Sequence, residues 1–164
     1  MNRRIEEEKE MGRFRRYFTL FRIFVRGGYA RAEYLKKKQY FKSMGEHCYL
    51  QPWNFGTEPK MISFGDNVHV ASGVTFINHD ISVFMLRYME PETKFHARVG
   101  DIEIGNNVFV GANSTILYNV KIGNNVIIGA GSIITKDIPD GVVAAGVPCK
   151  PIGSFENFAN KMKD

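Results

Sequence analysis

The residues with the clearest chemical potential in this 164-residue chain are Asn78, His79 and Asp80, which follow one another directly. An imidazole can accept a proton from a hydroxyl group near neutral pH, so His79 is a candidate general base. The carboxylate of Asp80 can either orient that imidazole or cap a turn, and both interpretations stay open. The two cysteines, Cys48 and Cys149, lie far apart without C-x-x-C spacing, which indicates neither a disulfide framework nor a zinc site.

A six-residue repeat surrounds these residues and predicts the elements that position them. Large apolar residues recur in this register, with one gap after the third: Phe64, Val70, Phe76, Ile104, Val110, Ile116, Ile122, Ile128 and Ile134. The fifth residue of each hexad is small or aliphatic in eight cases: Val68, Val74, Val108, Ser114, Val120, Val126, Ser132 and Ile138. Neither the period of an amphipathic helix nor that of a plain strand produces this spacing.

The repeat predicts a coil with three flat sides. Turn-forming pairs such as Asn106-Asn107 separate the apolar positions, and Asn tolerates the positive φ of a tight corner. Three hexads complete one triangular coil, and stacked coils align their apolar residues into an internal column. Residues 64–81, 104–121 and 122–139 each supply one coil.

The register breaks after the Asn78-His79-Asp80 triplet, and residues 82–103 are predicted to be one long inserted loop. Asp80 itself occupies a fifth position, where the pattern otherwise places a small or aliphatic residue. A local rule that is broken in an otherwise regular sequence marks a functional position. The predicted fold class is therefore mainly β: a parallel β-helix with an N-terminal helical segment and one insertion.

Two stretches, residues 104–111 and 122–152, resemble the hexapeptide-repeat acyltransferases, and most of all the maltose, galactoside and polysaccharide O-acetyltransferases. The similarity extends over about residues 45–153. It implies that the β-helix is left-handed and that the protein is a homotrimer with active sites at the subunit interfaces. It also implies direct transfer of an acetyl group from acetyl-CoA, the cosubstrate, to a saccharide hydroxyl, without a metal.

The resemblance also implies roles for individual residues. His79 matches the catalytic histidine of the family, and Asp80 is the second expected catalytic residue. Six positions are implied to line the acetyl-CoA groove: Phe109, Ala112, Ala130, Thr135, Lys136 and Lys150. Small side chains let the pantetheine arm approach the backbone, and the two ammonium groups offset phosphate charge. Phe109 stands where the family more often has Trp.

The acceptor is expected to contact four polar residues: Gln51, Asn54, Asn78 and His96. Trp53, beside Asn54, can stack on a sugar ring or fill the core. His96 lies in the inserted loop, which in the family reaches across to the acceptor site. The alternative acceptor is an antibiotic, as in the streptogramin and chloramphenicol acetyltransferases, with the same hydroxyl chemistry.

The N-terminal segment is basic and aromatic. Residues 11–42 contain ten Lys or Arg residues and one acid, Glu33, with aromatic residues at helical spacing from Phe14 to Phe24. Gly27-Gly28 is predicted to separate this helix from a second one over about residues 29–42. Two interpretations stay open: helices that cap the end of the β-helix, or an amphipathic surface that lies on an anionic membrane.

Three parts are therefore expected: a basic amphipathic helical segment (1–44), a β-helix acyltransferase domain (45–153) and a C-terminal tail (154–164). We expect a cytoplasmic protein with at most peripheral contact to the inner membrane face, because the chain lacks a long apolar run and has few cysteines. No recognised nucleic-acid motif accompanies the basic segment. The remaining alternatives are a non-catalytic scaffold and a trimeric, carbonic-anhydrase-like metal site, which the absence of histidine from residues 102–152 disfavours.

Overall fold

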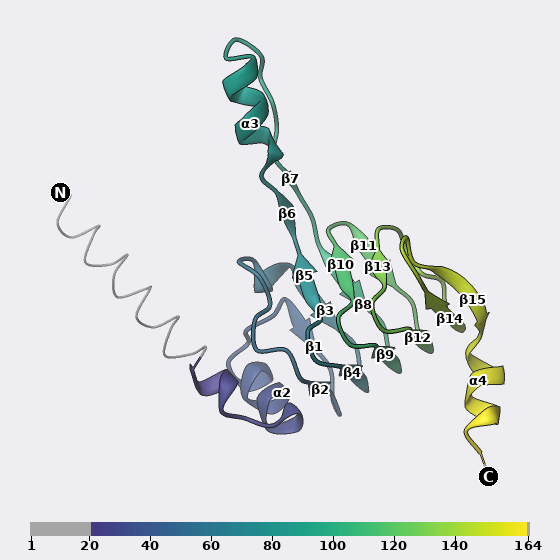
Figure 1. Cartoon of the computed structure of the whole chain (residues 1–164). Helices are drawn as coiled ribbons and strands as arrows, with labels where there is room; N and C mark the ends of the chain where they lie inside the picture. Colours follow the sequence, from purple (N-terminus) through teal and green to yellow (C-terminus); the bar gives the residue numbers. More distant parts are fainter. Residues whose placement is uncertain (1–20, 164) are drawn as a thin grey trace.

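The computed structural model describes residues 21–163, and its centre is a parallel β-helix with three faces (Figure 1). The first face stacks β1 (Ser43–Met44), β3 (Ile62–Phe64), β8 (Ile102–Ile104) and β11 (Val120–Ile122). The second face stacks β2 (Tyr49–Leu50), β4 (Val68–Val70), β9 (Val108–Val110), β12 (Val126–Ile128) and β14 (Val142–Ala145). The third face stacks β5 (Thr75–Ile77), β10 (Thr115–Leu117) and β13 (Ile133–Ile134).

The six-residue register sets the interior of this coil. All nine large apolar positions and all eight fifth-position residues are buried. Alternate residues of a strand point to the same side, so the fifth residue of one hexad and the large residue that opens the next both face inward. Strand pairing keeps like positions in line, as where Val108 pairs with both Val68 and Val126. The predicted β-helix fold class is confirmed.

Asparagine ladders form one edge of the coil. Asn67, Asn107 and Asn125 all adopt positive φ, between 54° and 56°. Their side chains are hydrogen-bonded in a row: Asn67 Nδ2 donates to Asn107 Oδ1 at 2.9 Å, and Asn107 Nδ2 donates to Asn125 Oδ1 at 2.9 Å. The corner residues thus supply both the backbone geometry and the contacts between successive coils.

The coil begins earlier than the repeat indicates, with the two short strands β1 and β2. They pair in parallel with β3 and β4 respectively, so they form part of a coil beneath the first complete one. The loop that follows, including the 3₁₀ helix η1 (Pro59–Met61), has no hexad register. Met44 and Leu50 are themselves six residues apart, but the 20 residues from Met44 to Phe64 do not fit the six-residue register, so the nine-position repeat does not include this partial coil.

The N-terminal end of the coil is covered by helical structure. Residues 21–24 are helical, and the helix is interrupted at residues 25–27. Gly27 separates the two helices as predicted, but Gly28 is already the first residue of α2 (Gly28–Lys37). The second helix is shorter than the expected span of residues 29–42, because the chain turns after Lys38 and buries Phe41 in the core. The predicted positions from Phe14 to Phe18 lie outside the described residues.

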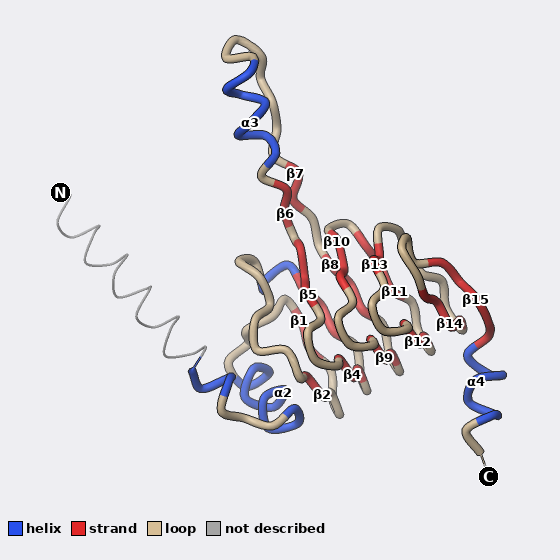
Figure 2. The backbone as a smooth tube through the Cα atoms, in the orientation of Figure 1, coloured by secondary structure: helices blue, strands red, loops and turns tan. Residues whose placement is uncertain are grey.

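The predicted insertion is an arm with its own secondary structure. It consists of β6 (His79–Asp80), α3 (Ser82–Met89) and β7 (Arg98–Val99), and β6 and β7 pair antiparallel at its base. The arm projects away from the coil (Figures 1 and 2). The coil resumes with β8 at Ile102, two residues earlier than the register indicated.

The C-terminal end closes with an antiparallel strand and a helix. β15 (Lys150–Ser154) pairs with β14, and α4 (Phe155–Lys161) follows. The Ser154 side chain caps α4 by accepting a hydrogen bond from the Asn157 backbone N–H at 3.1 Å. Figure 1 shows α2 and α4 at opposite ends of the coil.

Candidate functional site

His79 lies where the chain leaves the third face of the coil and enters the arm. It is half-buried on β6, and its backbone pairs with Val99 of β7. Its Nδ1 is 3.3 Å from the hydroxyl oxygen of Thr57. In the tautomer protonated on Nδ1, the ring donates to Thr57 and keeps Nε2 as a proton acceptor. A hydroxyl group that fixes the ring in this way leaves Nε2 available as a base.

Thr57 is the site residue that the sequence analysis missed. It belongs to the loop between β2 and η1, which has no repeat register, and it precedes His79 by 22 positions. Nothing in the spacing of residues connects the two positions. Only the stacking of the partial first coil beneath the third face brings them together.

The carboxylate of Asp80 caps a turn. Its Oδ1 accepts a hydrogen bond of 2.7 Å from the backbone N–H of Ser82, the first residue of α3. The backbone and hydroxyl hydrogen bonds of Ser82, and more weakly Arg98, lower the pKa of Asp80. Of the two interpretations that the sequence left open, the described contacts correspond to the capping one.

Asn78 is buried at the base of the arm. Its Nδ2 donates to the Gly100 carbonyl at 3.5 Å, and its backbone carbonyl accepts from the Gly100 N–H at 2.9 Å. Its Oδ1 is buried and has no hydrogen-bond partner among the described residues. A buried amide oxygen without a donor is unfavourable. Asn78 therefore connects the two chain segments at the base of the arm, and its Oδ1 can accept one further hydrogen bond.

A groove with a volume of 320 Å³ lies along the loop that carries Thr57. It is lined by Gln51, Trp53, Asn54 and Gly56, among others, and by the chain around β5. Asn54 Oδ1 accepts a hydrogen bond of 3.1 Å from the Gly56 N–H, which shapes the loop that also carries Thr57. The two acceptor residues expected before the repeats, Gln51 and Asn54, are thus brought next to the segment that contacts His79.

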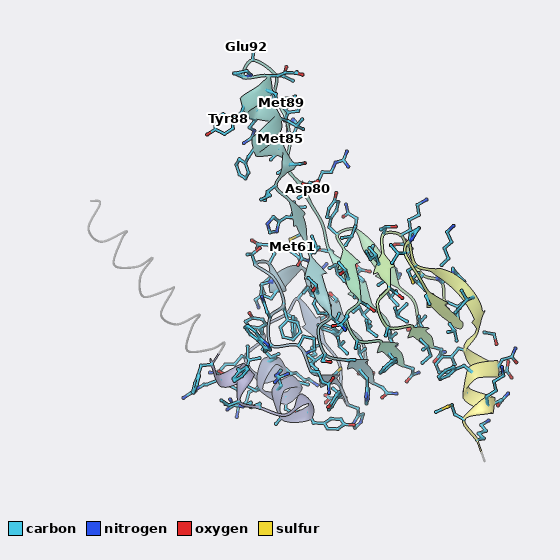
Figure 3. All side chains as sticks on the ribbon, viewed as in Figure 1. Met61, Asp80, Met85, Tyr88, Met89 and Glu92 are labelled. Atoms are coloured by element: carbon cyan, nitrogen blue, oxygen red, sulfur yellow. The ribbon has the colours of Figure 1, made fainter. Side chains whose placement is uncertain are left out.

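His96 is exposed on the return segment of the arm, between α3 and β7. Figure 3 shows how the arm carries its side chains outward, from Asp80 at the base to Met85, Tyr88 and Met89 farther out. A residue on such an arm can reach a site only where the arm itself meets another surface.

Residues implied to bind acetyl-CoA fall into two groups. Ala112 and Ala130 follow the second face at the same corner of successive coils, where the Gly131 N–H donates to the Ala112 carbonyl at 2.8 Å. Thr135, Lys136 and Lys150 are exposed beyond that corner, on the C-terminal coil and β15. Alanine side chains at a corner leave room for a narrow chain, and exposed ammonium groups can offset phosphate charge.

Phe109 lies elsewhere. It points outward from the middle of β9 into an apolar hollow of 420 Å³, which His69, Ile127, Phe155 and Phe158 also line. The hollow separates the second face from α4. Within one chain, Phe109 is therefore placed on a face of the coil rather than at the Ala112–Ala130 corner.

Neither cysteine is placed to act as a nucleophile. Cys48 and Cys149 are both buried free thiols. Burial is the main cause that raises the pKa of each thiol, so both stay protonated near neutral pH. Within residues 21–163, no group of three or more His, Cys, Asp or Glu residues is placed to hold a metal ion.

Comparisons with known proteins agree with this architecture. The profile of the family described as "Bacterial transferase hexapeptide (six repeats)" matches residues 101–136. Protein CapG of Staphylococcus aureus is 52% identical over 66% of this chain and 61% of its own length. The galactoside O-acetyltransferase of Escherichia coli (strain K12) is 34% identical over 70% of this chain and 64% of its own length. The chain thus spans less than two thirds of these curated relatives.

A solved structure gives the same result at the level of the fold. A galactoside acetyltransferase in complex with coenzyme A matches with a TM-score of 0.61 and 28% identity, covering 93% of this chain and 86% of that one. The predicted fold class, a left-handed parallel β-helix, is the one found in this chain. The repeat register and the three-faced coil agree with these similarities: residues 101–136 carry the bacterial transferase hexapeptide repeat, and the chain has the fold of the hexapeptide-repeat acetyltransferases.

Proposed function

We propose that the protein transfers the acetyl group of acetyl-CoA to a hydroxyl group of a saccharide, with His79 as general base. The observation that carries this proposal is the position of His79. It lies at the base of the arm and contacts Thr57, which directly follows Gly56 in the loop that lines the groove with Gln51 and Asn54. The galactoside O-acetyltransferase similarity supports both the reaction and the acceptor class.

The chemistry is a direct transfer. His79 Nε2 accepts the proton of the acceptor hydroxyl while that oxygen attacks the thioester carbonyl. The carbon–sulfur bond then breaks, the thiolate of CoA leaves, and the proton held by His79 is delivered to it. No protein nucleophile is needed, in keeping with the protonated state of Cys48 and Cys149.

The acetyl-CoA groove is proposed along the corner of Ala112 and Ala130, with Thr135, Lys136 and Lys150 at its phosphate end. We also propose a homotrimer, in which this corner faces the His79 region of a neighbouring subunit. Support for an assembly comes from the arm, whose exposed apolar residues need a partner surface: Ile81, Phe84, Met85, Tyr88, Met89 and Val99. Light scattering after size exclusion will show three copies, and a monomer at micromolar concentration would contradict this part.

The proposal is tested by the release of CoA thiol from acetyl-CoA in the presence of free sugars, nucleotide sugars and antibiotics. Turnover with a saccharide supports the proposed acceptor class. Turnover with an antibiotic but with no saccharide would support acetyl transfer from acetyl-CoA and contradict the proposed saccharide acceptor. A protein that does not bind acetyl-CoA at all would contradict the enzyme function.

Thr57→Val removes the hydroxyl that contacts His79 and keeps the shape of the side chain. We expect kcat/KM for the acceptor to fall roughly fivefold to tenfold, because one hydrogen bond contributes about 1 kcal/mol. The KM for acetyl-CoA stays unchanged, and the pH profile of kcat/KM shifts. Thr57→Ser, which restores the hydroxyl, recovers the activity. An unchanged rate and pH profile in Thr57→Val would show that the hydroxyl does not position the base.

Replacing Lys136 or Lys150 with alanine is expected to raise the KM for acetyl-CoA, with kcat unchanged. Both side chains are exposed, so solvent screening keeps the effect moderate, roughly threefold to tenfold for each. The effect shrinks as salt is added. Lys161→Ala, on α4, is the matched control and leaves KM as it was. Equal KM values in all three variants would remove both lysines from the phosphate site.

A further inference from the structure

The N-terminal end of the coil carries apolar side chains that the cap does not use. The residues that pack against the coil from this segment are buried: Ile23, Ala32, Leu35 and Phe41. Others point outward and are each between 59% and 64% exposed: Phe21, Phe24, Val25 and Tyr29. These four form what we call the N-terminal apolar surface. Capping of the coil accounts for the first set and leaves the second unexplained.

The local geometry separates the two sets. Residues 21–24 form a helical turn, and Phe21, Phe24 and Val25 follow one another at helical spacing on one side of it. Ile23 lies on the other side and is fully buried. The turn is therefore apolar on both sides, whereas a helical turn on the surface of a soluble protein usually has a polar outer side.

The segment that carries this surface is basic. Residues 21–42 contain seven basic residues and one acid: Arg22, Arg26, Arg31, Lys36, Lys37, Lys38, Lys42 and Glu33. Arg31 is buried, Lys36 pairs with Glu46, and Lys42 pairs with Asp101 at 2.6 Å. Arg22, Lys37 and Lys38 are exposed. The whole segment gathers at one end of the coil, opposite α4 (Figure 1).

Aromatic residues extend the surface toward the groove. Trp53 is 48% exposed, and its ring centroid is 6.0 Å from that of Phe24. Tyr29 contacts Tyr49 edge-on, with centroids 4.8 Å apart. Trp and Tyr combine an apolar ring with a polar group, which suits the boundary between lipid and water.

We propose that the N-terminal apolar surface docks the protein on an anionic lipid bilayer, with the cations around it contacting the headgroups. Exposed aromatic and aliphatic side chains enter the acyl boundary, and nearby Lys and Arg residues attract anionic lipid. Among residues 21–163, no helix is long and apolar enough to cross a membrane.

Charge and polarity favour this partner over two others. A second copy docked through the same surface would bring two strongly basic segments together, which is repulsive. A nucleic acid would satisfy the cations but would leave the exposed Phe and Val side chains in water. An anionic bilayer satisfies both features at once.

The test is sedimentation of the full-length protein with vesicles of phosphatidylcholine alone or mixed with phosphatidylglycerol, without acetyl-CoA or acceptor. We expect binding to the anionic vesicles to exceed binding to the neutral ones by at least about tenfold, because each contacting cation contributes roughly fivefold. Raising the salt from about 0.1 M to about 1 M weakens the binding. A protein that stays in the supernatant with anionic vesicles at low salt overturns the proposal.

Two pairs of variants separate the apolar and the charged contributions. Phe21→Ser combined with Val25→Ser should reduce vesicle binding by about tenfold or more, whereas Ile152→Ser, exposed on β15, leaves it unchanged. Arg22→Glu combined with Lys37→Glu should also reduce it, whereas Lys161→Glu does not. If the Phe21/Val25 variant binds vesicles as the wild type does, or if its oligomeric state changes instead, the surface serves another partner. Because no transfer is measured, failure here leaves the proposed reaction untouched.

Discussion

His79→Asn lowers kcat/KM for acetyl transfer by about 10²- to 10⁴-fold, the usual contribution of a positioned general base. The amide of Asn has a similar size but cannot accept the proton of the attacking hydroxyl. The KM for acetyl-CoA changes little, because within one chain His79 lies on β6 rather than at the Ala112–Ala130 corner proposed for acetyl-CoA. Thiol release with a saccharide acceptor measures the effect.

The matched control is His47→Asn. His47 is an exposed histidine at a corner with a positive φ of 57°, a geometry that Asn tolerates. This variant should keep wild-type kinetics. Circular dichroism and the elution volume of both variants should equal those of the wild type. A His79→Asn protein that retains more than about a tenth of the activity would contradict the role of His79 as the base.

Arg31→Ala should reduce the free energy of unfolding by about 3 kcal/mol, because it leaves a set of buried carbonyl groups without a donor. The Arg31 side chain is 7% exposed, and within residues 21–163 it has no carboxylate among its hydrogen-bond partners. Its guanidinium donates to backbone carbonyls on both sides of a junction: Ile23, Phe24, Arg26, Leu50, Gln51 and Pro52. Burial lowers the pKa of Arg31, but an arginine stays charged at neutral pH.

The position of these carbonyls explains the size of the effect. Two of them belong to the helical turn of residues 21–24, that of Arg26 lies just after this turn, and three belong to β2 and the loop after it. Arg31 therefore joins the N-terminal cap to the edge of the first coil.

Arg31→Lys, with fewer donors, should reduce the free energy of unfolding by about half as much as Arg31→Ala. Lys37→Ala on the exposed side of the same helix should lose less than about 0.5 kcal/mol. Denaturant unfolding at fixed protein concentration distinguishes these values, and equal stability of Arg31→Ala and Lys37→Ala would contradict the role.

The interior of the β-helix could be predicted from sequence because its rule is local and periodic. Ile104, Val110 and Ile116 are buried for the same reason, since each occupies the inward position of its hexad. The nine-position register did not include the two-residue strands Ser43–Met44 and Tyr49–Leu50. Met44 and Leu50 are six residues apart, but Met44 precedes Phe64 by 20 residues, which is not a multiple of six. They are held by pairing with β3 and β4, a long-range effect that spacing does not encode.

The candidate site was only partly predictable, for a related reason. His79 was visible because it breaks the register, and Gln51 and Asn54 were visible through the family resemblance. Thr57 was not, because its contact with His79 depends on how a loop without register folds over the third face. The role of Asp80 was ambiguous because its carboxylate can orient the neighbouring histidine or cap a turn, and only the position of the Ser82 N–H distinguishes the two roles.

The most direct test of acetyl transfer is mass spectrometry of a quenched reaction of the wild-type protein, acetyl-CoA and the saccharide with the highest turnover. We predict one acetyl ester on the saccharide for each CoA thiol released, no thiol release without the acceptor, and no acetyl group on the protein. An acetylated side chain that forms and decays during turnover would contradict direct transfer. Thiol release without any acetylated saccharide would contradict the proposed function itself.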